Sequence, residues 1–262
     1  MDDPGIYEEI VRLRAAGRRA ALATIVQTKG STPRHEKAKL LLREDGTTLG
    51  TIGGGSLENE VLRRAEECLK TGRHELVKLD LGGKDKDRLG MLCGGKVEVF
   101  IEIIGAPPRF LIFGAGHVSK ALVPMLKLMG LQVTVVDERP DMLNLERFPD
   151  ADGMAVKKNQ DAFKELDPDP MTGLAILTNS HEQDLEVLRW AVMTEAGYVG
   201  MIGSRTKVKT LYEKLEKEGI PQERLSRVHA PIGLDIGAET PAEIAVAIAA
   251  EIVKYYRKPP RR

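Results

Sequence analysis

The residues with the clearest chemical potential form a glycine turn near the middle of the chain. Gly114 and Gly116 follow the apolar run at residues 110–113, and apolar residues at helical spacing come after them. A second apolar run, residues 133–136, ends in Asp137. The order strand, glycine turn, helix, strand and terminal acid is typical of a βαβ unit that binds a dinucleotide. The spacing therefore predicts a site for a phosphate-bearing ligand at this turn.

Each residue of the turn has a distinct expected role. Gly114 permits the tight turn, and Gly116 lets a phosphate approach the backbone. The helix that begins near His117 would offer unpaired N–H groups and the positive end of its dipole to an anion. Asp137 stands where such units hold a ribose hydroxyl, and Ser119 replaces the third glycine of the usual fingerprint. Because many domains carry this turn without a nicotinamide cofactor, NAD(P) binding stays an open alternative.

A run of three glycines gives the first half of the chain a second candidate anion site. Gly53, Gly54 and Gly55 precede apolar residues at helical spacing, and Ser56 is the expected N-cap of that helix. Backbone N–H groups before a helix can form a cradle for an anion. A sharp strand-to-helix turn would use the same glycines, and both interpretations stay open.

Cys93 is the candidate reactive thiol. It lies between Leu92 and the pair Gly94 and Gly95 in a predicted loop, where neighbouring N–H groups would favour its thiolate. An ordinary buried cysteine is the alternative. Cys68 falls on the apolar face of a predicted helix, and we expect it to be unreactive core.

Further polar residues follow the predicted strands of the second half. Ligands collect at the carboxyl ends of parallel strands, so one crevice could gather several of these side chains. They are His117, His181, Ser204, Arg205, His229 and Asp235. Arg205 could clamp a phosphate or remain a solvated charge at a helix start, and each histidine could simply cap a turn. His181 with Asp184 supplies too few ligands for a metal, so no metal site is predicted.

The amino-acid composition disfavours several classes of binding partner. The 262 residues include 39 Lys plus Arg and 39 Asp plus Glu, so charge favours neither nucleic acid nor an anionic membrane as a partner. An aromatic content of 4% disfavours a base-stacking surface. No apolar run is long enough to span a bilayer, and the start MDDPGIYEEI is unlike a signal peptide. Two cysteines without a CxxC motif support neither a disulfide framework nor a zinc site. We expect a cytoplasmic protein.

The order of predicted elements indicates two domains. Residues 105–108 are Gly-Ala-Pro-Pro, the best candidate linker. We expect an N-terminal domain over residues 1–105, a linker over 106–108 and a C-terminal domain over 109–262. Strands alternate with helices in the C-terminal part, so the expected fold is α/β, with a Rossmann-like doubly wound parallel sheet preceded by a smaller α/β domain. Residues 240–243 predict a capping box for a last helix that is apolar nearly all round and should be buried.

Taken together, these motifs resemble the XdhC/CoxI family of xanthine dehydrogenase accessory factors. In the first half the resemblance rests on residues 30–34 (GSTPR), 50–55 (GTIGGG) with Glu58, and 90–95 (GMLCGG). In the second half it rests on residues 113–118 (FGAGHV), 203–205 (GSR), 229–237 (HAPIGLDIG) and 240–243 (TPAE). The segments span nearly the whole chain in the order typical of the family.

The resemblance implies a carrier of molybdenum cofactor (molybdopterin) more than a turnover enzyme. Such proteins support the replacement of an oxo ligand by a sulfido ligand and deliver the product to a xanthine dehydrogenase-like molybdenum hydroxylase. A cysteine desulfurase is an implied partner, and we expect a homodimer. Many members carry Cys where this chain has Ser56, so Cys93 would have to supply the thiol. We expect Cys93 and the glycine loops to face one crevice between the domains.

Two alternatives come from other functional classes. The first is an NAD(P)-dependent oxidoreductase, supported by Asp137 but lacking a recognisable substrate base. The second is a protein-binding module whose nucleotide site is vestigial.

Overall fold

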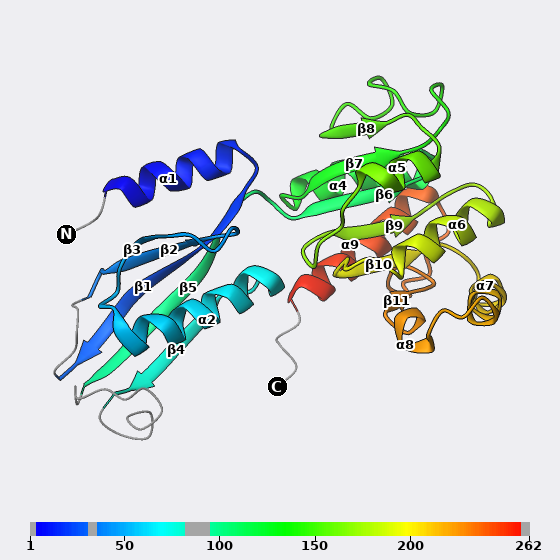
Figure 1. Ribbon diagram of the computed structural model, residues 1–262. Coiled ribbons are helices and arrows are strands. Elements are labelled where there is room, and N and C mark those ends of the chain that lie inside the picture. Colours follow the sequence, from blue (N-terminus) through cyan, green and yellow to red (C-terminus); the bar gives the residue numbers. More distant parts are fainter. Residues whose placement is uncertain (1–3, 31–35, 82–94, 258–262) are drawn as a thin grey trace. The chain divides into compact units, whose positions relative to one another are not determined.

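The structure is a computed structural model, and it describes residues 4–30, 36–81 and 95–257. The chain divides into two compact units, Met1–Ala106 and Pro107–Arg262, which are coloured blue to green and green to red in Figure 1. Cys93 and Gly94 lie outside the described residues.

The N-terminal unit is built on an antiparallel sheet of five described strands in the order β3-β2-β1-β5-β4. The strands are β1 (Arg19–Lys29), β2 (Lys39–Arg43), β3 (Thr48–Gly50), β4 (Glu75–Asp80) and β5 (Lys96–Gly105), and the helices are α1 (Pro4–Ala15) and α2 (Gly55–Thr71).

Alternation along β1 creates two cores in this unit. Ala21, Ala23 and Ile25 pack with the buried face of α2, whereas Ala20 and Leu22 pack with the buried residues of α1. Successive strand residues point to opposite faces, so one strand can serve both helices. The sheet is therefore covered on both sides.

The C-terminal unit is built on a parallel sheet of six described strands in the order β11-β10-β9-β6-β7-β8. The strands are β6 (Arg109–Phe113), β7 (Gln132–Val136), β8 (Gly153–Ala155), β9 (Gly173–Ile176), β10 (Tyr198–Met201) and β11 (Val228–His229). The helices are α4 (His117–Leu128), α5 (Asn159–Glu165), α6 (His181–Ala191), α7 (Arg205–Lys217), α8 (Gln222–Leu225) and α9 (Pro241–Arg257). This is the Rossmann strand order. From β6 the chain adds β7 and β8 on one side of the sheet, and it then adds β9, β10 and β11 on the other side. Such an order leaves a crevice between the carboxyl ends of β6 and β9. The predicted doubly wound fold is confirmed.

Both faces of this sheet are buried. Phe110 and Ile112 of β6 belong to a core shared with α4 and α9, while Leu111 and Phe113 belong to a core shared with α6 and α7. Continuous apolar strands are typical of parallel sheets covered by helices on both sides, and the arrangement is visible in Figure 1.

The last helix differs in part from its prediction. The capping box is present, since Glu243 accepts the N–H of Thr240 and donates its own N–H to the Thr240 hydroxyl. However, Val246 and Val253 are 47% and 43% exposed, so α9 is buried along one face only. Apolar residues on all sides of a helix do not require burial on all sides, because apolar atoms ordinarily contribute much of the accessible surface of a folded protein. Over the described residues, no helix combines the length and apolar composition needed to cross a bilayer.

Two leucines of α4 test which face of this helix packs into the core. Leu126 is fully buried in the core, whereas Leu128 is 89% exposed on the same helix. Leu126→Ala should lower the free energy of unfolding by about 2–5 kcal/mol, because it removes buried methyl groups and leaves a cavity. Leu128→Ala, the matched control, should change it by less than about 0.5 kcal/mol. Urea denaturation of both variants measures this, and equal effects would contradict the assigned packing of α4.

Candidate functional site

The glycine turn after β6 requires glycine at its first position. Gly114 has a φ of +104°, and a Cβ there would lie 2.7 Å from the Leu177 carbonyl carbon and closer still to its oxygen. The Gly114 N–H donates to the Val136 carbonyl at 2.8 Å. The ends of β6, β7 and β9 therefore meet at a point that has no room for a side chain.

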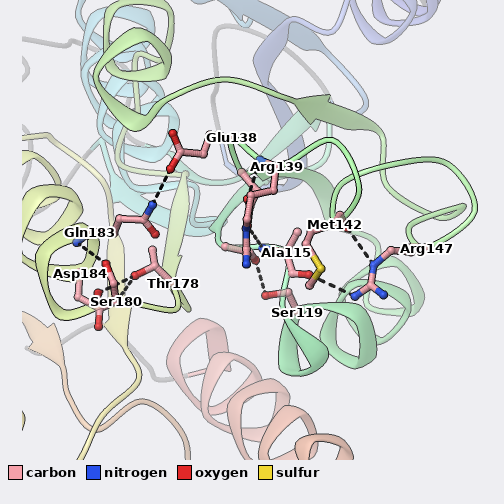
Figure 2. Close-up of polar contacts among 12 residues, drawn as sticks. Ala115, Ser119, Glu138, Arg139, Met142, Arg147, Thr178, Ser180, Gln183 and Asp184 are labelled. Carbon is pink, nitrogen blue, oxygen red and sulfur yellow. Dashed lines mark hydrogen bonds and ion pairs between the residues drawn. The ribbon is translucent and has the colours of Figure 1, made fainter.

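Ser119 takes the place of the third fingerprint glycine without opening the turn. Its side chain is fully buried, and its hydroxyl donates to the Gly114 carbonyl at 2.6 Å (Figure 2). The serine therefore packs α4 against the turn and satisfies a backbone acceptor at the same time.

Gly116 is the open end of the turn. It is the N-cap of α4, it provides no side-chain hydrogen bond to the helix, and a Cβ there would meet nothing within 4 Å. The first N–H groups of a helix lack intrahelical partners and carry partial positive charge. The start of α4 can thus accept an anion that approaches closely along the backbone.

Asp137 closes the inner side of the turn. Its Oδ2 accepts the Ala115 N–H at 2.7 Å, and its two oxygens accept Nε and Nη2 of Arg139 at 2.9 and 2.7 Å. Burial raises the pKa of Asp137, but the hydrogen bonds from Arg139 and Ala115 outweigh it and hold the pKa below its ordinary value. The carboxylate predicted to hold a ribose hydroxyl is thus engaged on both oxygens within the unit.

A pocket of about 450 Å³ opens beside the turn, at the carboxyl ends of β6, β7 and β9. This volume falls within the range of about 300–1,000 Å³ typical of small-molecule sites. The pocket lies at the strand-order reversal, where doubly wound sheets bind ligands. Its lining comprises Gly114, Val136, Asp137, Glu138, Lys158, Asn159, Gln160, Thr178, Glu182, Gln183, Glu186 and Arg189.

A buried ion pair lies next to Thr178, which lines this pocket. Asp184 is fully buried, forms an ion pair with Lys207 and accepts the Thr178 hydroxyl at 2.6 Å. Thr178 lines the pocket, so the pair connects the starts of α6 and α7 to it. Sequence reasoning missed Lys207, because no local signal joins residues that are 23 positions apart. No cluster of three or more His, Cys, Asp or Glu side chains suited to a metal occurs among the described residues.

The remaining predicted residues at helix starts do not line this pocket. His117 and Arg205 are exposed first residues of α4 and α7, and Asp235 is exposed in the segment before α9. Ser204 caps α7 by accepting the Lys207 N–H. His181 lines a separate groove of about 370 Å³ between α6 and α7. Among the predicted residues that the structure describes, Gly114 and Asp137 are the two that line the pocket.

His229 lies against aromatic rings instead of in the pocket. Its Nδ1 is 3.3 Å from Oε1 of Glu251, and its ring centroid is 4.7 Å from that of Tyr198. Tyr198 donates its hydroxyl to the same Glu251 oxygen at 2.5 Å. Burial raises the pKa of Glu251, but the hydrogen bonds from His229 and Tyr198 outweigh it and lower the pKa overall. This histidine therefore joins the start of β10 to α9.

In the N-terminal unit, the Glu58 carboxylate occupies the turn that the glycine run forms. Glu58 accepts the N–H groups of Ile52 and Gly54 at 3.1 and 3.2 Å and the Thr51 hydroxyl at 2.6 Å. Burial raises the pKa of Glu58, but these three hydrogen bonds outweigh it and lower the pKa overall. Of the glycine N–H groups expected to cradle an external anion, that of Gly54 already binds Glu58 and that of Gly53 donates to the Thr51 hydroxyl at 3.2 Å.

The cap of α2 differs from its prediction. Gly54 is the N-cap and Gly55 begins the helix, so Ser56 lies within the first turn. Gly53, Gly54 and Gly55 all have positive φ, a conformation that only glycine adopts readily, and the helix therefore begins directly after the tight turn.

Two further predicted residues of this unit are described. Gly95 accepts the Leu81 N–H at 2.8 Å. Cys68 is buried in the core, and burial raises the pKa of its thiol to about 11. A thiol of this kind is unreactive at neutral pH.

Alanine substitutions at the two glycines of the Rossmann turn should have different effects on the free energy of unfolding. Gly114→Ala should lower the free energy of unfolding by at least about 2 kcal/mol, because its Cβ collides with the Leu177 backbone at positive φ. Gly116→Ala should cost about 1 kcal/mol or less, since its Cβ enters open space. Chemical denaturation measures both, and a reversed order of stability would contradict the geometry of the turn.

Glu58 gives the N-terminal turn a pH dependence. Because its folded pKa is lowered, its contribution to stability is present above the ordinary pKa of 4.5 and is lost as pH falls through the folded value. At pH 7, Glu58→Gln should destabilise the protein by about 0.5–2 kcal/mol, and the difference from the wild type should shrink below pH 4.5. Glu66→Gln, exposed on the same helix, is the control. A difference that does not change between about pH 7 and about pH 3 would refute this role.

Comparison with known proteins agrees with this architecture. Residues 110–252 match the family model described as the XdhC Rossmann domain, and residues 13–80 match the one described as the XdhC and CoxI family. A crystal structure described as a xanthine dehydrogenase from Bacillus halodurans covers 95% of either chain with a TM-score of 0.54 and 23% identity, which supports the fold.

Curated relatives point the same way. The uncharacterized protein YqeB of Escherichia coli (strain K12) is 36% identical over 97% of this chain, which spans only 47% of that protein. A probable xanthine dehydrogenase component from Bacillus subtilis (strain 168) is 24% identical over 90% of this chain and 92% of its own length. The molybdenum cofactor insertion chaperone PaoD of E. coli is 23% identical over 96% of this chain and 88% of its own length. The chain belongs to the XdhC and CoxI family.

Proposed function

We propose that this protein binds molybdenum cofactor and delivers it to a xanthine dehydrogenase-type molybdenum hydroxylase. The observation that carries the proposal is the open start of α4, where Gly116 leaves space beside N–H groups that no side chain caps. Molybdopterin carries a phosphate, and a helix start of this kind suits a phosphate. The adjoining pocket gives the rest of the ligand a polar wall.

The relatives' names support a role in maturation. One is a molybdenum cofactor insertion chaperone, and another is a probable component of a xanthine dehydrogenase. Because the chain spans about half of YqeB, the activity of that longer protein is not assumed for this one.

The proposal extends to the sulfuration of the cofactor before delivery. A cysteine desulfurase would supply the sulfur, and Cys93 is the thiol of this chain proposed to support that step. The cofactor, when bound, supplies the metal centre that the client enzyme uses, while the protein binds, orients and shelters it. We also propose that the protein acts as a homodimer in the cytoplasm.

An NAD(P)-dependent oxidoreductase is the second candidate function. It is favoured by the position of the pocket, which lies where doubly wound sheets hold the nucleoside half of a dinucleotide. The carrier function is preferred because one relative is named as a molybdenum cofactor insertion chaperone.

The cofactor should copurify with the protein. The chain is expressed in a host that makes molybdenum cofactor, and the purified protein is assayed for molybdenum and for the fluorescence of oxidised pterin. We expect both in the wild type, with about tenfold weaker retention in Gly116→Ala, because a Cβ at this position holds the phosphate away from the N–H groups. Cys93→Ser should also retain less pterin.

Lys209→Ala, on the exposed face of α7, serves as the control and should retain as much as the wild type. Wild-type protein that carries neither molybdenum nor pterin would refute the carrier function. Turnover of a small substrate with NADH would favour the second candidate.

A further inference from the structure

The outward face of α9 is apolar and open to solvent. Val246 and Val253 are 47% and 43% exposed, and their spacing of seven residues places them two turns apart on one side of the helix. Ala242 is exposed one turn before Val246, and Ala249 and Ala250 lie partly buried between the two valines. We call these five residues the α9 stripe. It extends over about three turns without a charged side chain among its members.

The composition of the α9 stripe differs from that of an ordinary solvent-facing helix. Charged residues make up 30% of the chain, and the exposed residues of α7 include Lys209, Glu213 and Glu216. Valine has a lower helix propensity than the long polar residues that suit exposed positions. The two exposed valines of α9 therefore weaken the helix without gaining full burial. A contiguous exposed apolar face with a charged border marks an interaction surface.

The charged border of the α9 stripe has opposite signs at its two ends. Glu243 lies in the first turn of α9, and Lys254 and Arg257 lie in the last turn. Glu243 and Lys254 are 11 residues apart, so they lie on the same side of the helix but about 16 Å apart along its axis, too far to pair with each other. Glu243 accepts the N–H groups of Glu239 and Thr240 through Oε2 alone, which leaves Oε1 for a cation.

The α9 stripe is complementary to a second copy of itself when the two helices run antiparallel. A two-fold axis between Ala249 and Ala250 places Val246 of one copy against Val253 of the second copy. The same operation brings Glu243 within about one turn of Lys254 in the second copy, on the same side of the pair. Alanines at the axis let the two backbones approach closely, and antiparallel helix dipoles attract each other. Shape and charge thus select one occupant for this face.

We propose that two copies of this chain associate through the α9 stripe, as an antiparallel pair of α9 helices with the two-fold axis between Ala249 and Ala250. The inference rests on the homodimer of the proposed function and names its surface. Each α9 has 17 residues and is about 25 Å long, so one helix from each copy gives a small contact. A contact of this size gives a reversible dimer with a dissociation constant on the order of micromolar.

Disulfide crosslinking of the full chain tests the position of the two-fold axis. Ala250→Cys places two thiols beside the axis, within the Cα separation of about 4.4–6.8 Å that a disulfide spans. Ala242→Cys, exposed on the same stripe, is the control, because its two copies would be about 20 Å apart. Under mild oxidation, Ala250→Cys should form a covalent dimer on a non-reducing gel. Ala242→Cys should match the wild type, in which Cys68 and Cys93 set the background.

Sedimentation equilibrium of the full chain tests the surface itself. Val253→Glu places a carboxylate against the apolar stripe of the second copy, so it should raise the dissociation constant of the dimer at least about tenfold. Val11→Glu makes the same change at a 68% exposed valine of α1 and should leave the dissociation constant unchanged. Matching urea denaturation midpoints for the two variants would show that the fold is retained.

Charge reversal tests the antiparallel orientation. Glu243→Lys places a lysine near Lys254 of the second copy, and Lys254→Glu places a glutamate near Glu243 of the second copy, so each variant alone should dimerise more weakly than the wild type. A mixture of the two variants restores opposite charges at both ends, and it should form the mixed dimer in preference to either homodimer. Loss of the Glu243 cap cannot produce this preference, because the cap is missing in the same chain before and after mixing.

A wild type that stays monomeric up to about 100 μM would overturn the inference. So would equal crosslinking of Ala250→Cys and Ala242→Cys, or an unchanged dimer in Val253→Glu, which would place the contact on another surface. These outcomes are separate from failure of the carrier function. Monomeric protein that retains molybdenum and pterin would uphold the carrier function alone. Protein that crosslinks through Ala250→Cys without carrying molybdenum would uphold the α9 surface alone.

Discussion

The close approach of two backbones, at Gly114 and Leu177, is the constraint on which the Rossmann unit depends. Without a Cβ at Gly114, the ends of β6 and β9 can meet at the point where the strand order reverses. Ser119 and Asp137 then satisfy the polar groups on the inner side of the turn. The outer side, at Gly116, keeps its N–H groups and its space for a ligand.

The two glycine turns of this chain show how one acidic side chain decides what a turn can bind. In the N-terminal unit, Glu58 lies within the first turn of α2 and accepts from the N–H groups that precede it. In the C-terminal unit, the first turn of α4 has no acidic residue, and its cap makes no side-chain hydrogen bond. Similar glycine runs thus give a turn occupied by a carboxylate of the chain in one unit and, in the other, a helix start without a side-chain cap.

The elements that sequence predicted best are those with a strong local signal. The apolar run of β6, its glycine turn and the 240–243 capping box were all recognisable from spacing, and the structure confirms them. The four-residue α8 and the two-residue β11 are too short to produce a periodic pattern, and sequence reasoning missed them. Ion pairs between residues far apart in the sequence could not be predicted for another reason. Neither Asp184 with Lys207 nor His229 with Glu251 has a spacing that reveals its partner.

The proposed function depends on the binding of a cofactor's phosphate at the open start of α4. Its most direct test is a crystal structure of the chain purified from a host that makes molybdenum cofactor, with anomalous data at the molybdenum edge. We expect a molybdenum peak and continuous ligand density whose phosphate lies within hydrogen-bonding distance of the N–H groups after Gly116. Cofactor density with its phosphate away from this turn would contradict it.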